Sequence, residues 1–505
     1  MEKGYGTLKA GALVFLASAC SMVLELVAGR ILAPYIGVSL YTWTSIIGVV
    51  LAGIALGNYL GGRLGDKYGT PFLVSCVFFA GGLAGLAILP ETIILNTKPL
   101  PYEFHLMWKS TIYTLMLFFL PTCILGMVSP MVIKLRLASI ENTGRTVGAI
   151  YAVSTVGAII GTFATGFVLI NTFGTRSILW GVAIVLLLTG VFASSSWKSI
   201  GKWSSTLVVI AVYLFAFTWR ESYAATVMKE SNYFSINIQD TNVQGRNVKY
   251  LSLDRLIHSY IDVADPTFLG YDYEKTFAQL AAYKSVTEPD FRVLFIGGGG
   301  YSFSRYLETI YPSSTIEVAE IDPAVTETVY DHLALPRDTK IKTFNSDARI
   351  FLIERNATFK YDLVVGDAFN DMSVPYHLTT YEFNEMVKRN MRPDGIYMVN
   401  VIDDLTGGRF LVSLMHTLRE SFQCVYLYTP DSVSGGAGTY VAAATNSPLD
   451  MPRYLETLRA RGLEPVGGKL IRLEDLPPVI PMGQAVFLSD DYVPVDNMIA
   501  PLFTH

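Results

Sequence analysis

Charged side chains are scarce in the first 220 residues of this sequence. These residues hold 14 Lys and Arg and 6 Asp and Glu, a formal charge of +8, whereas residues 221–505 hold 24 and 37, a charge of −13. The first part is therefore very apolar, and the second has the composition of an acidic soluble domain. Because nucleic acids are bound mainly through Lys and Arg, this acidic balance argues against a nucleic-acid partner.

Cysteine is scarce as well. The four cysteines are Cys20, Cys76, Cys123 and Cys424, and no two of them form a CxxC pair. The sequence thus offers neither a disulfide framework nor a cysteine metal site. We interpret the four thiols as small buried apolar side chains and expect no metal.

What the first part does contain is long apolar runs. Runs of about 18 or more apolar residues predict transmembrane helices. Seven such runs are present, at 11–33, 43–61, 72–94, 112–133, 146–170, 177–195 and 204–219. The first run is too long, and too closely followed by others, to be a cleaved signal peptide. We therefore predict a polytopic helical domain over 1–220 that crosses the cell's inner (plasma) membrane seven times, or eight if 94–111 hides a short span.

Two of these runs carry small-residue ladders. Gly53, Gly57 and Gly61 repeat every four residues, and so do Gly157 and Gly161. Such spacing places glycines on one helix face, where two backbones can approach closely. We expect contacts within the bundle, with a dimer contact as the alternative.

Two ionisable residues lie in or near the first apolar run. Glu25 and Arg30 are costly to place there and are expected to form a mutual or interhelical salt bridge. A role in transport or ligand binding is the alternative.

Two arguments disagree about the side of the membrane on which the second part of the chain lies. Positively charged loops favour a cytoplasmic N-terminus, which with seven spans places the second part outside the cytoplasm. An eighth span near 94–111 would place it inside. Since the ligand inferred below is a cytoplasmic metabolite, we predict a cytoplasmic soluble domain.

The second part begins with a β-rich stretch. Residues 231–261 alternate between apolar and polar side chains around a Gln-Gly-Arg turn, and 271–286 has a helical pattern. We assign 221–285 to a small β-hairpin unit with a linker helix. From 286 to 505, short apolar strands alternate with helices, which predicts a doubly wound, Rossmann-like α/β domain.

Polar residues follow the first predicted strands of that domain. They are Gly297, Gly298, Gly299 and Gly300 after the first strand, Glu320 and Asp322 after the second, Asp347 with Ala348 after the third, and Asp367 after the fourth. Glycines let a backbone approach a ligand at a helix N-terminus, and an acid after the second strand suits ribose hydroxyls. The order predicts an adenosine-type ligand, although such acids can also cap helices. A third fingerprint glycine is missing, which disfavours a dinucleotide.

In these residues the chain resembles the spermidine synthase (aminopropyltransferase) family over about 230–450. The matching segments are "FIGGGGYS", "VAEIDP", "SDAR" and "YDLVVGDAF", with Pro375 following. Together with "ELVAGRILAPYIGVSLYTW" at 25–43, the whole chain resembles a membrane-fused member of that family.

The resemblance implies both a reaction and residue roles. An amine attacks the methylene beside the sulfonium of decarboxylated S-adenosylmethionine, methylthioadenosine leaves, and no tightly bound cofactor is used. Glu320 would bind the ribose, Asp347 the adenine amino group, and Asp367 the attacking amine. The implied partners are a sulfonium nucleoside and a polyamine, and the family often forms homodimers.

The chain also departs from the family pattern. Gly300 and Tyr301 stand where the family has Asp-Gly, and Asn370 stands at a second acidic position, with Asp371 beside it. Phe234 follows Tyr233 where the family has glutamine, and His258 replaces another glutamine. Tyr233 is a candidate nucleoside-binding residue, and the candidate amine-binding residues are Tyr271, Asp272, Tyr273 and Glu274. Asn370, Asp371 and His258 are candidate catalytic residues beside Asp367.

Because these acids and glutamines of the family are replaced, the sequence is compatible with three functions. Aminopropyl transfer to a polyamine is the first. A site with fewer acids repels a carboxylate less, so a lyase that cyclises S-adenosylmethionine itself to methylthioadenosine and homoserine lactone is the second. A ligand sensor or transporter is the third.

Overall fold

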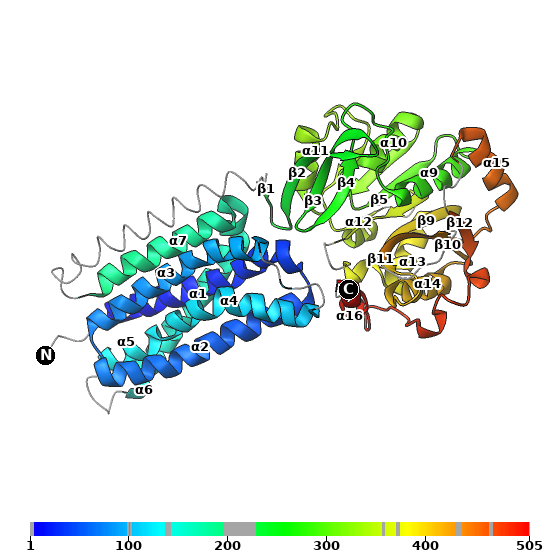
Figure 1. The fold of residues 1–505 in the computed structure, drawn as a ribbon. Helices are drawn as coiled ribbons and strands as arrows, with labels where there is room; N and C mark the ends of the chain where they lie inside the picture. The colour runs from blue at the N-terminus through cyan, green and yellow to red at the C-terminus, as the bar shows by residue number, and fades with distance from the viewer. Residues whose placement is uncertain are drawn as a thin grey trace. The chain divides into compact units, whose positions relative to one another are not determined.

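The chain folds into two compact units, Met1–Ser235 and Ile236–His505, and each is described by itself. The computed structural model describes residues 5–97, 100, 104–136, 143–194, 229–355, 359–369, 374–430, 437–463 and 468–503. The first unit is a bundle of helices, and the second contains both sheets and helices (Figure 1).

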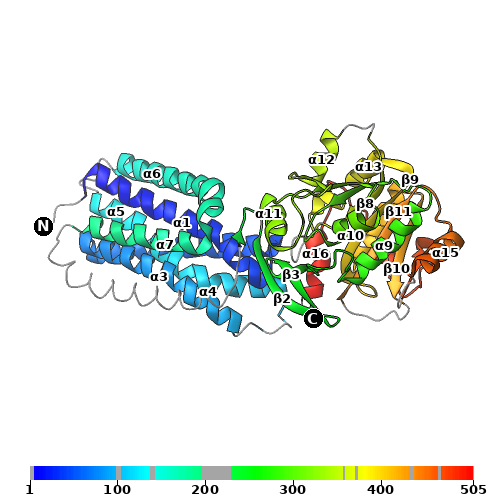
Figure 2. The same cartoon turned by 90° about the horizontal axis from the view of Figure 1, so that it is seen from above.

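Six segments of the first unit are long and apolar enough to cross a membrane. Figures 1 and 2 show their helices running side by side. The helices are α1 (Thr7–Ile36), α2 (Leu40–Tyr68), α3 (Pro71–Thr97), α4 (Leu106–Gly126) continued by α5 (Val128–Arg136), α6 (Thr143–Ala164) continued by a π-helical turn (Thr165–Leu169), and α7 (Ile170–Ala193). They confirm a polytopic membrane domain. The run predicted at 204–219 lies outside the described residues.

The suggestion of a further span within 94–111 is wrong. Helix α3 extends to Thr97 and α4 begins at Leu106, so both helices occupy parts of that stretch. The few residues left between them are far short of the ~20 that a helix needs to cross a bilayer.

The glycine ladders pack inside the bundle. A Cβ atom on Gly57 would lie 2.1 Å from the carbonyl oxygen of Cys123 in α4, and one on Gly157 would lie 2.4 Å from the carbonyl oxygen of Phe15 in α1. Each ladder therefore marks a place where two helix backbones touch, because only hydrogen fits between them.

Arg30 does not form the expected salt bridge among the described residues. Its guanidinium donates instead to two backbone carbonyls, Ser231 O and Tyr233 O, the latter at 2.5 Å. Glu230, which directly precedes Ser231, accepts hydrogen bonds from the N–H and hydroxyl of Thr175 at 2.8 and 2.7 Å. These bonds fix the segment around Ser231 to α1 and to the start of α7.

The second unit begins with an antiparallel meander of β2 (Ser235–Val243), β3 (Arg246–Leu253) and β4 (Leu256–Ile261). The β2–β3 turn uses Gln244 and Gly245, both with positive φ, which suits the twist of a tight hairpin. Helix α9 (Asp272–Ser285) then leads to the large sheet.

The large sheet has eight strands in the order β12-β10-β11-β9-β8-β5-β6-β7. The strands are β5 (Arg292–Ile296), β6 (Thr315–Ala319), β7 (Lys342–Phe344), β8 (Tyr361–Gly366), β9 (Met391–Asp404), β10 (Cys424–Pro430), β11 (Ala437–Thr445) and β12 (Gly468–Arg472). Strands β5 to β9 are parallel, and β10 to β12 add an antiparallel edge. This mixed Rossmann-like sheet confirms the predicted α/β class.

Helices connect and cover these strands (Figures 1 and 2). They are α10 (Ser302–Ile310), α11 (Pro323–His332), α12 (Ala348–Glu354), α13 (Tyr381–Asn390), α14 (Phe410–Ser421), α15 (Met451–Arg461) and α16 (Val495–Ile499). The chain moves from β5 outward through β6 to β7 and then returns to β8 on the other side of β5. The strand order reverses there, and ligands of such sheets bind at this point, beyond the carboxyl ends of the strands.

We predict that Gly57→Ala destabilises the bundle by about 1–3 kcal/mol, because the added methyl group has no room against α4. The thermal unfolding midpoint of the detergent-solubilised protein measures this loss. Gly48→Ala is the matched control on the same helix, since a Cβ there meets nothing within 4 Å. Equal midpoints for the two variants would contradict the close α2–α4 contact.

Candidate functional site

The glycine-rich turn after β5 lies directly against the end of β8. A Cβ atom on Gly297, whose φ is +91°, would lie 2.5 Å from the carbonyl oxygen of Asp367. The Gly297 N–H donates to Ala319 O, and the Asp367 N–H donates to Ile296 O, both at 2.9 Å. These bonds join the carboxyl ends of β5, β6 and β8, so their following residues share one location.

Glu320 lies at the end of β6 and faces the turn. Its Oε2 accepts the Gly298 N–H at 2.8 Å, and its Oε1 accepts the Asp322 N–H at 2.9 Å. Burial raises the pKa of Glu320, whereas these backbone donors oppose the rise. Each carboxylate oxygen can accept more than one hydrogen bond, so Glu320 can hold the turn and still accept from ribose hydroxyls.

Two of the predicted binding acids are helix caps. Asp322 is almost fully buried and accepts the Ala324 N–H at 2.9 Å at the start of α11. That contact explains its position without a ligand. Asp322 is therefore a helix cap, and its role in binding a ligand stays a prediction.

Asp347 caps α12, of which Ala348 is the first residue. Its Oδ1 accepts the Arg349 and Ile350 N–H groups, and its Oδ2 lies 2.7 Å from Nε2 of His377. The hydrogen bond with His377 holds the pKa of Asp347 below its usual value. The side chain is only half-buried, so it could still accept a bond from an amino group.

Asp367, the first residue after β8, has two side-chain donors. Tyr273 donates its hydroxyl to Oδ2 at 3.1 Å, and Asn400 donates its amide to Oδ1 at 2.8 Å. Burial raises the pKa of Asp367, and the two donors and His258 oppose the rise. The residue is thus a fixed carboxylate with an affinity for protons above that of a surface aspartate.

Asp367 forms part of the wall of a cavity of about 460 Å³. The other lining residues are Arg255, Leu256, Ile257, His258, Tyr260, Tyr271, Tyr273, Phe369, Asn400, Ile402, Ala437, Gly438 and Thr439. They come from β4, the start of α9, and the ends of β8, β9 and β11. A cavity of this size with one carboxylate and an aromatic wall suits a small organic cation.

His258 is held between two backbone carbonyls. Its Nδ1 lies 3.0 Å from Leu256 O, and its Nε2 lies 3.3 Å from Phe369 O. A neutral imidazole has one N–H and can donate to only one of them. Burial lowers the pKa of His258, so the neutral form dominates at neutral pH. His258 therefore connects β4 to the segment after Asp367.

The four residues at 271–274 have different environments. Tyr271 and Tyr273 line the cavity. Glu274 is buried and accepts hydrogen bonds from the Ser302 hydroxyl and the Tyr271 N–H, and burial raises its pKa to about 7. The side chain of Asp272 is 94% exposed and pairs with Lys275 at 2.8 Å. Neither acid lines the cavity, and their role in binding the amine stays a prediction.

Three other candidates cannot be placed in this cavity. Tyr233 belongs to the first unit. Asn370 and Asp371 lie outside the described residues. Their roles stay predictions.

Asn400 and Tyr260 are site residues that the sequence reasoning missed. Asn400 lies in β9, where the segment "GIYMVNVI" at 395–402 has a single polar amide among apolar residues. That interruption is the signal that could have revealed it. Tyr260 is at the end of an alternating hairpin strand, where a tyrosine is ordinary, so no local signal marked it.

Gly300 stands where the spermidine synthase family has an aspartate, and its surroundings leave no room for a side chain. Its N–H donates to the Ser259 hydroxyl at 2.9 Å, and a Cβ on it would lie 2.5 Å from Cδ1 of Ile261 and 2.6 Å from Cβ of Ser259. Strand β4 therefore occupies the space that an acid at this position would need. The next residue, Tyr301, has φ of +58° and is buried.

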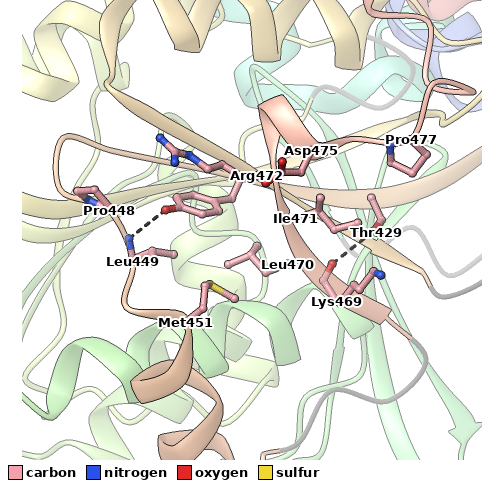
Figure 3. A pocket seen from close by; sticks show the side chains of 11 residues that line it. Thr429, Pro448, Leu449, Met451, Lys469, Leu470, Ile471, Arg472, Asp475 and Pro477 are labelled. Atoms are coloured by element: carbon pink, nitrogen blue, oxygen red, sulfur yellow. Dashed lines mark hydrogen bonds between the residues drawn. The ribbon is translucent and has the colours of Figure 1, made fainter.

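A second, larger cavity of about 560 Å³ lies between β10, β12 and the start of α15 (Figure 3). The Tyr426 hydroxyl accepts the Leu449 N–H beside it, and Lys469 and Arg472 contribute the positive charges. None of the residues named above as site candidates lines this cavity. The strand ends and their carboxylates mark the smaller cavity as the candidate site.

The fold and the site define a Rossmann-like unit with its carboxylates gathered at the switch point of the sheet. No family model matches the chain. The chain is 27% identical over 188 residues to the "Probable polyamine aminopropyl transferase" of Bifidobacterium longum, covering 37% of this chain and 39% of that protein. It is 32% identical over 110 residues to the "Polyamine aminopropyltransferase" of Vibrio vulnificus, covering 22% and 37%.

A longer similarity extends across both units. The chain is 22% identical over 473 residues to "Polyamine aminopropyltransferase 1" of Streptomyces coelicolor, which covers 88% of this chain and 86% of that protein. The first two matches span less than two fifths of their relatives' length. The chain is thus similar to polyamine aminopropyltransferases, the class of protein that its sequence motifs resemble, and six of its N-terminal segments are long and apolar enough to cross a membrane.

We predict that Gly300→Asp lowers the stability of the soluble unit by about 1–3 kcal/mol, because β4 fills the space beside residue 300. The thermal midpoint of the soluble unit's transition in the full chain measures the loss. Gly483→Asp adds the same charge where a Cβ meets nothing within 4 Å and serves as control. A Gly300→Asp protein as stable as this control would show that β4 can move aside for an acid.

Proposed function

We propose that the protein is an aminopropyltransferase that uses decarboxylated S-adenosylmethionine and a polyamine. The observation that carries this proposal is the position of Asp367, a partly buried carboxylate in a small cavity at the switch point, next to a glycine-rich turn and Glu320. The names of the three relatives give the same class of reaction for those proteins.

The nucleoside is expected to lie along the glycine-rich turn. The turn has positive φ at Gly297 and Gly299, so its backbone can approach a ligand without a side chain in between. Glu320 accepts from ribose hydroxyls, and the half-buried Asp347 accepts from the adenine amino group. The carboxyl ends of β5 and β8 then direct the three-carbon arm toward Asp367.

The reaction is a displacement at carbon. The lone pair of the neutral amine attacks the methylene beside the sulfonium, the carbon–sulfur bond breaks with its electron pair going to sulfur, and methylthioadenosine leaves. Asp367 accepts a hydrogen bond from the attacking amine and takes the proton that the new ammonium loses. Tyr273 and Asn400 hold both carboxylate oxygens, so the amine meets a fixed partner.

We also propose that the soluble unit faces the cytoplasm. Sulfonium nucleosides are cytoplasmic metabolites, whereas the positively charged loops combined with seven spans favour the other side. A C-terminal reporter fusion that is active only outside the cytoplasm would contradict this assignment.

The first test is mass spectrometry of the purified protein incubated with decarboxylated S-adenosylmethionine and putrescine. We expect methylthioadenosine only when both are present, and a loss of ~10²–10⁴-fold in its rate of release in Asp367→Asn, because the amide cannot accept the proton. Asp272→Asn is the control, since that exposed side chain lies outside the cavity.

Two outcomes would contradict the proposal. Methylthioadenosine formed from S-adenosylmethionine without an amine would establish the cyclising lyase. S-adenosylhomocysteine in place of methylthioadenosine would establish methyl transfer.

The pH profile tests the role of Asn400. Transfer needs the ionised form of Asp367, so kcat/KM rises as pH increases through the raised pKa of this carboxyl group. Asn400→Leu removes a donor that lowers this pKa, so the acidic limb of the profile is expected at higher pH than in the wild type. Tyr273→Phe removes the second donor and should shift the limb in the same direction. If the acidic limb of the profile does not move in either variant, the limb reports the titration of a group other than Asp367.

A further inference from the structure

Tyrosine rings form one wall of the Asp367 cavity. Tyr273 donates its hydroxyl to Asp367, Tyr271 stacks on Tyr273 with ring centroids 5.3 Å apart, and Tyr260 contacts Tyr271 at 5.0 Å. All three rings line the cavity. They form a row of adjacent rings that begins with Tyr273 at the carboxylate.

The described lining contains one carboxylate, Asp367. A diamine brings two amines, and Asp367 can accept from only the one that reacts. The far amine is protonated at neutral pH and needs a partner when it leaves water. Within the described residues of this wall, aromatic faces are what remains to stabilise it.

The hydroxyls of Tyr271 and Tyr273 donate to other groups. Tyr271 donates to Ile257 O at 2.7 Å, and Tyr273 donates to the carboxylate of Asp367. A phenol that donates its proton to an acceptor has a more electron-rich ring, which strengthens the attraction of the ring face for a cation. Burial raises the pKa of both phenols, so the rings stay neutral.

We propose that Tyr260, Tyr271 and Tyr273 bind the far ammonium group of a diamine or polyamine acceptor through cation–π contacts. This inference rests on the proposed aminopropyl transfer and adds how the acceptor is selected. The aromatic wall takes the place of a second acid, and the near amine is left free to approach Asp367.

Three four-carbon amines test the inference: n-butylamine, putrescine and 4-aminobutyrate. Their far ends are neutral, cationic and anionic, and their reacting ends are identical. We expect kcat/KM for methylthioadenosine release to be at least about tenfold higher with putrescine than with n-butylamine, which corresponds to the strength of a desolvated cation–π contact.

Matched variants locate the effect. Tyr260→Leu and Tyr271→Leu remove a ring face and should lower the putrescine-to-butylamine ratio about tenfold. Tyr260→Phe and Tyr271→Phe keep the face and should leave the ratio within about twofold. Both amines are measured on the same sample, so a partly unfolded variant changes both rates equally and leaves the ratio intact.

Three results would overturn the inference while leaving aminopropyl transfer in place. They are equal rates for putrescine and n-butylamine in the wild type, a ratio that the leucine variants retain, and a preference for 4-aminobutyrate. The last would assign the selection to Arg255, which also lines the cavity. Absence of methylthioadenosine with every amine would instead overturn the proposed transfer, and with it the inference.

Discussion

The contact between Gly297 and the backbone of Asp367 is the constraint on which the site depends. A methyl group at residue 297 would lie 2.5 Å from the Asp367 carbonyl oxygen, so the turn after β5 and the end of β8 can meet only if residue 297 is glycine. This contact brings the glycine-rich turn and the acid after β8 to one edge of the sheet. Glu320, which binds the same turn, is fixed there as a consequence.

Buried carboxylates are costly, and this site stabilises its two in different ways. Glu320 receives backbone N–H groups from the turn and from its own loop, which makes it part of the scaffold. Asp367 receives donors from two side chains, Tyr273 and Asn400, and lines a cavity. The first arrangement favours holding a ligand in place, and the second favours exchanging a proton with one.

The helical unit is stabilised in a different way from the sheet unit, by close contact between helix backbones. In lipid, close packing replaces much of the hydrophobic driving force, and the glycine faces of α2 and α6 allow their neighbours to approach to backbone contact. At one end of this bundle Arg30 donates to two backbone carbonyls, because a guanidinium offers several hydrogen-bond donors. Arg30, which the sequence suggested as a salt-bridge partner of Glu25, thus stabilises the backbone segment around Ser231.

The sequence by itself determined the classes of structure. Long apolar runs require membrane helices, and alternating strands and helices ending in "IGGGG", "AEID" and "VVGD" require a Rossmann-like sheet with acids at one edge, because parallel strands end on the same side. Tertiary structure decided which acids face the cavity. Asp322 and Asp272 look as suitable as Asp367 in sequence, yet one caps a helix and the other faces solvent. It also decided that β4 fills the space beside Gly300 and that Asn400 and Tyr260 reach the site, since these contacts join segments that are distant in the chain.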